Sequence, residues 1–251
     1  MTRNRQLTFR KMIGKGLKGH VDPMRHSSGF TLIESLVAMI VISITLVAIV
    51  PPIFWATGTR VQNRRAEQAL AIAQGEIDRV RGVLERSEVP LAANLPPEVS
   101  KADFASYRGP NPKSPWASKM RSIKPEFNTA ETATDGIQFP PSADTFIPVD
   151  TDGDGKADFL VQVFRDPGTC AVVNPCVAPE TPRIFAMKVR VYSAIALSSE
   201  LANLDTTKAT LIGTTGTGQA KNRPLAILSS QVARSVSSGA LDQRRDYNPG
   251  P

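Results

Sequence analysis

The sequence predicts an α+β fold in which one long N-terminal helix packs against an antiparallel β-sheet. Three observations support this fold class. A stretch of 26 residues from Phe30 to Trp55 carries no charge except Glu34, and as a helix it would be roughly 39 Å long. A segment with apolar residues at helical spacing follows, and strand-like runs occupy the C-terminal part of the chain.

The basic residues concentrate ahead of the apolar stretch. Residues 1–29 hold seven Lys or Arg and one acid, Asp22, and so account for +6 of the formal net charge of +7. A basic segment before an apolar one is typical of a membrane protein whose basic side lies in the cytoplasm. We therefore expect residues 1–29 to be a cytoplasmic leader, and we expect no nucleic-acid binding.

The apolar stretch is long enough to cross a membrane. Its helical length exceeds the roughly 30 Å hydrocarbon core, and the small-residue cleavage site of a secretory signal peptide does not follow it. Residues 30–55 are therefore predicted to form a transmembrane helix. Pro51 and Pro52 remove backbone donors, which predicts a kink or local melting near Val47–Pro52.

Glu34 is the one charge inside this stretch. Insertion scales put the cost of an acid at the bilayer centre at roughly 2.5–3.5 kcal/mol, and the cost is smaller near a helix end. Two interpretations stay open. The carboxylate reaches the interface, or it pairs with a positive group on another molecule.

The segment "GFTLIES", followed by some twenty apolar residues, resembles the cleavage and methylation signature of type IV prepilins and type II secretion pseudopilins. The resemblance implies that a prepilin peptidase cuts between Gly29 and Phe30 and that Phe30 is then N-methylated. It also implies that Glu34 faces the methylated amine of a neighbouring subunit during assembly. The family's helix-loosening proline corresponds to Pro51, and the second proline, Pro52, departs from that pattern.

The apolar residues that follow the prolines recur at spacings of three and four, which predicts an amphipathic continuation of the helix over residues 56–89. The predicted buried face contains Leu70, Ala73, Ile77, Val80 and Leu84. The run "AEQALAIAQGEIDRVR", residues 66–81, resembles the minor-pilin and minor-pseudopilin branch of the family.

Beyond the helix we expect a proline-rich variable loop region over residues 90–149 and a β-sheet domain over 150–233, followed by a flexible tail over 234–251. The predicted strands are 159–164, 184–193, 210–213 and 225–233. In the second of these, alternation puts Lys188 and Arg190 on the face opposite the apolar residues.

The segment "DTDGDGKADF" has the ligand spacing of a calcium loop. Carboxylates stand at loop positions 1, 3, 5 and 9, a glycine at 6, and a residue that offers its backbone carbonyl at 7. The predicted Ca²⁺ ligands are Asp150, Asp152, Asp154, Asp158 and the carbonyl of Lys156.

The last position of this loop departs from the calcium pattern. Position 12 is Val161 instead of a bidentate glutamate, so the missing ligand is water or another acid such as Asp144 or Asp166. The alternative is an acidic turn without metal. Four carboxylates within nine residues repel one another, which favours a structural Ca²⁺.

Cys170 and Cys176 are the two cysteines of the chain, and in an exported domain they are expected to form a disulfide loop; two unpaired thiols are the alternative. Both histidines, His20 and His26, lie in the leader. A mature chain without them has no His-based triad or His-ligated metal. The sequence also lacks a Walker loop and a nucleophile elbow. We therefore expect no enzyme.

Together these features predict a non-enzymatic pseudopilin or minor pilin of a type IV pilus or type II secretion-like filament. Its partners would be prepilin peptidase, other pilins and the assembly platform. It would cross the inner membrane once before assembly, with its soluble domain periplasmic or extracellular. The proline-rich domain and the acidic loop resemble pseudopilins of filamentous cyanobacteria that are linked to polysaccharide export.

Two alternatives to a filament subunit stay open. The first is a membrane-tethered extracytoplasmic module that binds a ligand with calcium and never joins a filament. The second is a surface enzyme that uses carboxylates alone.

Overall fold

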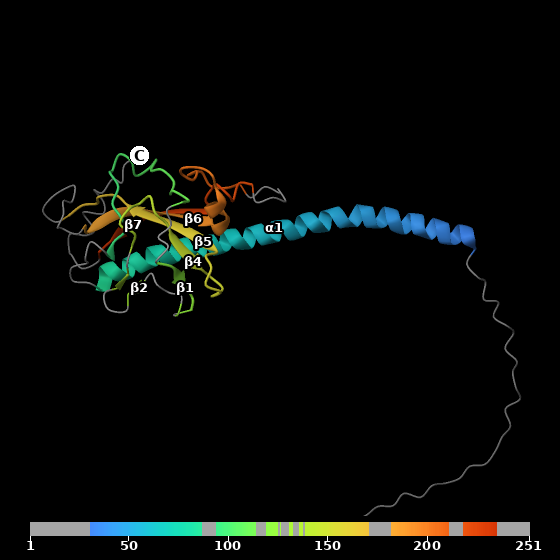
Figure 1. Cartoon of the computed structure of the whole chain (residues 1–251), viewed down its shortest axis with the longest axis horizontal. Coiled ribbons are helices and arrows are strands. Elements are labelled where there is room, and N and C mark those ends of the chain that lie inside the picture. The colour runs from blue at the N-terminus through green and yellow to red at the C-terminus, as the bar shows by residue number, and fades with distance from the viewer. Residues whose placement is uncertain are drawn as a thin grey trace, which may run out of the picture. The chain divides into compact units, whose positions relative to one another are not determined.

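The computed structural model describes residues 31–86, 94–113, 119–124, 126, 131–132, 136–137, 139–170, 182–210 and 218–234. The chain divides into two compact units, Met1–Val50 and Pro51–Pro251, each of which is considered by itself. The predicted α+β class is confirmed: helix α1 and a five-stranded sheet are the main elements (Figure 1).

Helix α1 spans Leu32–Arg86. Among the described residues it is the one helix long and apolar enough to cross a membrane. Its few hydroxyl groups bond within the helix: Ser43 Oγ donates to the Met39 carbonyl at 2.7 Å, and Thr45 Oγ1 donates to the Ile42 carbonyl at 2.8 Å. Because these hydroxyls are satisfied locally, they add little cost to an apolar environment.

The helix continues through Pro51 and Pro52 without a break. The expected local melting near Val47–Pro52 is therefore not found. Each proline removes one backbone hydrogen bond, but the residues on both sides keep their own helical bonds. The kink stays a prediction. It would lie where the two units meet, between Val50 and Pro51, and each unit is considered by itself.

The main sheet has the strand order β1-β4-β5-β6-β7. These strands are β1 (Arg121–Ser122), β4 (Ile147–Asp150), β5 (Phe159–Arg165), β6 (Ile184–Ser193) and β7 (Ala226–Ala233). Strands β2 (Glu131–Thr132) and β3 (Gly136–Ile137) form a separate pair, and the 3₁₀ helix η3 (Ala194–Ser198) follows β6.

The sheet is mixed, whereas the sequence predicted an antiparallel one. Strands β4 to β7 pair antiparallel, but β1 pairs parallel with β4, with Arg121 opposite Val149 and Ser122 opposite Asp150. A parallel pair needs a long connection, which residues 123–146 provide. The predicted strand over 210–213 is not found at Thr210, and residues 211–213 lie outside the described part.

One face of the sheet packs against α1. The helix contributes Ala69, Ala73, Ile77, Val80, Val83 and Leu84 to a core that also contains Phe159, Val161 and Val163 of β5 and Phe185, Met187, Val189 and Val191 of β6. The predicted stripe is correct at four of its five positions. Leu70 is exposed, and the neighbouring Ala69 is buried in its place.

The opposite face of the sheet is also covered. Two further clusters lie there: one around Val99, Phe104 and Phe164, and one around Phe146, Leu160 and Tyr192. Their covering residues come from 94–113, 143–146 and 194–204, so part of the segment expected as a variable loop forms a third layer.

Candidate functional site

The start of α1 is held by a side-chain cap. Thr31 precedes the helix, and its Oγ1 accepts the Glu34 backbone N–H at 3.3 Å, while the Thr31 carbonyl accepts the same N–H at 3.0 Å. Threonine followed three residues later by glutamate is the pattern of a capping box, which the sequence reading missed. Gly29 and Phe30 lie outside the described residues, so the structure does not test the processing point.

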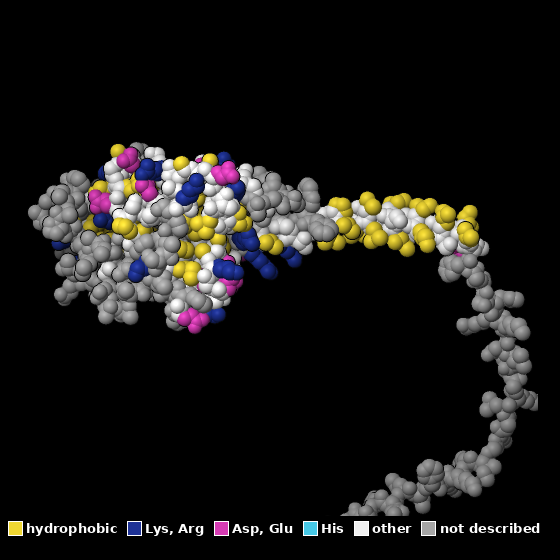
Figure 2. Space-filling model, viewed as in Figure 1, with side chains coloured by type: hydrophobic (Ala, Val, Ile, Leu, Met, Phe, Trp, Pro, Cys, Tyr) yellow, Lys and Arg dark blue, Asp and Glu magenta, His cyan; other side chains and the backbone are white. Residues whose placement is uncertain are grey.

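The N-terminal part of α1 exposes nearly every large apolar side chain it has. From Leu32 to Ile53 these side chains are 42–83% exposed. Figure 2 shows them as a continuous apolar surface along the helix. Glu34 is exposed in the first turn, so its carboxylate is available to a group outside the chain.

The acidic loop connects β4 to β5 and closes a β-hairpin in which Val149 lies opposite Phe159. Gly153 and Gly155 have φ values of +76° and +82°, a conformation that other residues rarely adopt. A Cβ on Gly153 would also come within 2.8 Å of the Lys124 side chain. Both glycines are therefore needed for this loop conformation.

Asp150 is the buried centre of the loop, 1% exposed at the end of β4. Its Oδ1 accepts the Gly153 N–H at 2.6 Å, and its Oδ2 accepts the Gly155 N–H at 3.1 Å and the Ser122 hydroxyl at 2.8 Å. Burial raises the pKa of Asp150, but these hydrogen bonds outweigh it and the net shift is downward. Asp150 thus joins the loop to β1 while it keeps its negative charge.

Three of the four predicted carboxylates come together. Single oxygens of Asp150, Asp152 and Asp158 all lie within 4.8 Å of one another. Asp158 Oδ2 also accepts the Thr151 N–H at 2.8 Å and the Thr151 hydroxyl. Asp154 is outside this group of three, and its Oδ1 accepts the Lys156 N–H at 2.8 Å.

The charge of this group is partly uncompensated. The Asp154 N–H bond lowers the pKa of Asp152, but desolvation and the charges of Asp154, Asp158 and Asp150 raise it, and the net shift is upward. Desolvation and the neighbouring negative charges together therefore outweigh the local hydrogen-bond donor. Oxygen ligands at this separation fit a hard divalent cation.

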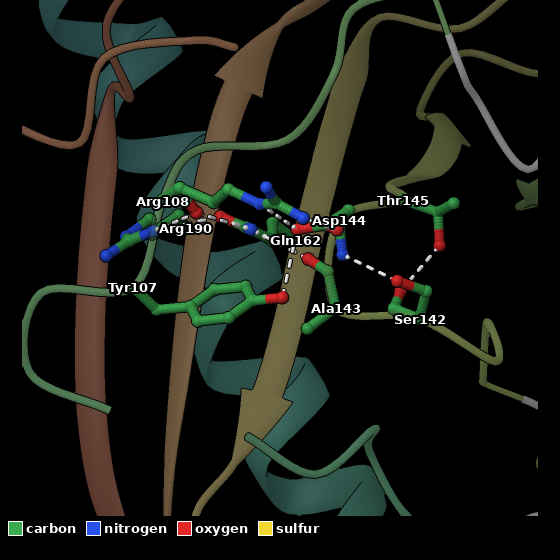
Figure 3. A network of polar contacts seen from close by, with 8 residues as sticks. All are labelled: Tyr107, Arg108, Ser142, Ala143, Asp144, Thr145, Gln162 and Arg190. Atoms are coloured by element: carbon green, nitrogen blue, oxygen red, sulfur yellow. Dashed lines mark hydrogen bonds and ion pairs between the residues drawn. The ribbon is translucent and has the colours of Figure 1, made fainter. Parts of the chain in front are cut away.

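Asp144 and Asp166, suggested above as additional ligands, have other partners. Arg108 donates two hydrogen bonds to Asp144, and Tyr107 Oη donates a third at 2.9 Å (Figure 3). The Arg108 bond is the main reason that the pKa of Asp144 is lowered. Asp166 Oδ1 accepts the Ala186 N–H at 3.0 Å. A calcium ion in this loop would therefore need water or a backbone oxygen as its remaining ligand.

Figure 3 also shows why the second sheet face tolerates polar side chains. Gln162 is fully buried, and its Nε2 donates to the carbonyls of Ala143 and Arg108 at 2.8 and 3.1 Å. Arg190 donates to Gln162 Oε1 at 3.1 Å and lies over the Phe164 ring. Burial lowers the pKa of Arg190. The polar face of β6 is thus an internal network and not the solvent-facing surface that alternation suggests.

A buried ion pair between α1 and β1 was not predicted. Glu76 and Arg121 are 4% and 5% exposed, and Arg121 Nη1 donates to Glu76 Oε1. With Arg79 they line a cavity of about 270 Å³ that also borders Asp150. Nothing in the local pattern marks Arg121 as buried, because its strand has two residues and follows a segment rich in proline.

Cys170 is disulfide-bonded and 6% exposed, just beyond β5. Its predicted partner, Cys176, lies outside the described residues. The pairing of these two cysteines stays a prediction.

Comparison with known families gives one match. Residues 24–50 match the model of the prokaryotic N-terminal methylation motif. This motif supports a type IV prepilin-like protein. Comparisons with curated proteins and with solved structures gave no match. The motif includes Gly29, Phe30 and Glu34, and it points to a structural subunit that is anchored in a membrane by its apolar helix.

Proposed function

We propose that this chain is a non-catalytic pseudopilin or minor pilin, cut after Gly29, methylated on Phe30 and assembled into a filament through α1. The observation that carries the proposal is the methylation motif at the start of a helix whose apolar residues are exposed along the whole stretch from Leu32 to Ile53. A monomer in water would not expose so large an apolar surface. A bilayer before assembly and a bundle of like helices afterwards would both cover it.

Processing is the first test. Co-expression of the chain with a prepilin peptidase should yield a product that lacks residues 1–29 and carries one methyl group, as measured by intact-mass spectrometry. Gly29→Ala should abolish cleavage. Gly58→Ala is the matched control, because Gly58 lies in α1 with open space around its Cβ position. Normal cleavage of the Gly29→Ala variant would contradict the proposal.

Assembly is the second test. In the proposed filament, Glu34 pairs with the amine of Phe30 on a neighbour and so sets the stagger between subunits. Glu34→Gln should reduce crosslinking between subunits through residues 30–50 by at least about tenfold, the equivalent of roughly 1.4 kcal/mol. Glu67→Gln, which removes another exposed acid of α1, should leave crosslinking unchanged. Crosslinking of the Glu34→Gln variant at the wild-type level would contradict this pairing and would favour the alternative hypothesis of a membrane-tethered binding module.

We also propose that the loop from Asp150 to Asp158 binds one structural Ca²⁺, with Asp154 and the Lys156 carbonyl as further ligands. The proximity of three carboxylates and the raised pKa of Asp152 support it. Calcium should release heat on titration and raise the melting temperature of the domain. Asp158→Asn should remove both effects, whereas Glu200→Gln, which removes an exposed acid outside the loop, should remove neither. Absence of both effects in the wild-type chain would overturn the calcium assignment.

The cargo of such a filament is a separate proposal. Export of polysaccharide or protein by the filament fits the non-catalytic subunit proposed above. Loss of secreted polysaccharide, with secreted proteins unchanged, in cells that lack this chain would favour the first cargo.

A further inference from the structure

We propose that the arginines directly after the apolar stretch of α1 bind lipid phosphates on the far side of the membrane before the subunit is assembled. The group consists of Arg60, Arg64 and Arg65, called the arginine collar below. Figure 2 shows Lys and Arg side chains at the end of the apolar part of the helix. The inference rests on the membrane orientation in the proposed function, and it adds a binding surface that the methylation motif does not contain.

The charge of the collar is unusual for its place in the chain. Residues 56–68 contain three arginines and one acid, Glu67, and this segment would follow the membrane span on the exported side. Arginine near a span normally marks the cytoplasmic side, where the leader already supplies it. Arginines on the exported side oppose the usual orientation signal. A favourable interaction of these arginines on that side would offset this effect.

Two members of the collar, Arg60 and Arg64, face away from the globular domain, whereas Arg65, four residues before the buried Ala69, lies on the side of the helix that packs on the sheet further along. Arg60 precedes the buried Ala69 by nine residues, which is half a turn around an α-helix from the face that packs on the sheet. Arg64 lies one turn after Arg60 on nearly the same side. All three arginines are exposed, and none has an ion pair within the part of the chain that the structure describes.

The position of Arg60 along the helix suits a lipid headgroup, and Arg64 and Arg65 lie further out, roughly 17 and 18 Å beyond Ile53. Arg60 comes seven residues after Ile53, the last large apolar side chain described in the stretch, so the rise between them is roughly 10 Å. The headgroup layer on each side of a bilayer is roughly 5–7 Å thick. Helical side chains lean toward the N-terminus, which here is the apolar end of α1, and arginine extends its charged group to the interface.

Phosphate is the ligand chemistry that fits best. The planar guanidinium donates paired hydrogen bonds to phosphate oxygens. The alternative occupant is a carboxylate of a neighbouring subunit. A monomer in a bilayer separates the two, because it has no neighbour.

The test uses the full chain with ¹³C-labelled guanidinium carbons, one copy per lipid nanodisc, in buffer without inorganic phosphate. Solid-state NMR measures the dephasing of these carbons by lipid ³¹P. The variant Arg60→Gln, Arg64→Gln, Arg65→Gln should lose dephased signal equivalent to between one and three carbons. The matched control Lys101→Gln, Lys113→Gln, Lys208→Gln removes the same charge from exposed sites elsewhere and should lose none.

Equal dephasing in the wild-type chain and in the collar variant would overturn the lipid assignment. A loss of the same size in the control variant would overturn it too, since net charge would then be the cause. Neither result would affect the filament proposal, which is tested by cleavage and crosslinking. Conversely, failure of those two tests would not change the phosphorus contacts of a monomer in a bilayer.

Discussion

The two ends of α1 have the same helical geometry but differ in how far their apolar side chains are buried. Leu46 is 56% exposed and Leu84 is fully buried, although both are leucines in one uninterrupted helix. The second part of the helix packs small and branched side chains against its own sheet. The first part has no such surface within the described chain, and its methylation motif indicates that a membrane and other subunits provide it. The second part of α1 is thus buried by its own chain, whereas burial of the first part is proposed to come from a membrane and from assembly.

The largest effect is expected from the buried ion pair between α1 and β1, in the part of the helix that packs on its own sheet. Arg121→Leu leaves the Glu76 carboxylate buried without its main partner, which should destabilise the domain by about 3–5 kcal/mol. Thermal unfolding of the full chain in detergent micelles measures this loss of stability. The double variant Glu76→Leu, Arg121→Leu removes both charges and should recover most of the loss. A single variant as stable as wild type would show that water already solvates this pair.

A leucine pair sharpens the comparison directly. Leu84→Ala should lower the free energy of unfolding of the domain by about 2–5 kcal/mol, because it removes buried methyl groups and leaves a cavity. Leu46→Ala should leave this quantity unchanged and should instead weaken crosslinking between subunits. Chemical denaturation and crosslinking of both variants measure the two effects. Destabilisation of the domain by Leu46→Ala would mean that the two parts of the helix are not energetically separate.

Two glycines test the same difference on a smaller scale. Gly153→Ala places a Cβ at positive φ against Lys124 and should cost about 1–2 kcal/mol. Gly75→Ala places one in open space on the helix and should stabilise the domain by about 0.5–1 kcal/mol. Melting temperatures of the two variants should therefore shift in opposite directions. A shift in the same direction would contradict the conformation described for the acidic loop.

The smallest effect is expected at Asp205 on the surface of the domain. Hydrogen bonds from the Thr207 backbone and hydroxyl hold the pKa of Asp205 at about 2, below its usual 3.8, and Arg223 adds to the effect. A lowered pKa stabilises the folded state above about pH 4, and this contribution disappears as the pH falls toward 2. Because the pair is solvent-screened, Asp205→Asn should cost less than about 1 kcal/mol at pH 7. Urea midpoints at pH 7 and pH 2.5 should show the difference shrinking, and a constant difference would contradict it.

Regular patterns made much of the fold predictable. The predicted strand over 184–193 matches β6, and 225–233 matches β7 within one residue, because alternation of apolar residues marks the sheet face that packs on α1. The covering of the second face was not predictable in this way. It depends on Gln162, Arg190 and the backbone carbonyls of Arg108 and Ala143, which are far apart in the sequence and follow no period.

The acidic loop was predictable because its carboxylates and glycines lie at fixed spacing. Its support by Ser122 was not, since that contact depends on the parallel pairing of β1 with β4. The spacing also gave no sign that Asp154 lies outside the cluster. Single short strands give little sequence signal, and β1 has two residues. The same limit explains why the buried Arg121 was missed.

The cap at Thr31 has an electrostatic consequence for the start of α1. The peptide dipoles of a helix leave about half a positive charge at its N-terminus, so a protonated amine one residue before the cap is repelled there. Cleavage after Gly29, as proposed, would place such an amine on Phe30. Glu34, in the first turn at the same pole, would offset that repulsion within its own subunit before any neighbour arrives. One carboxylate would then serve the isolated chain as a counterion and the filament as a contact.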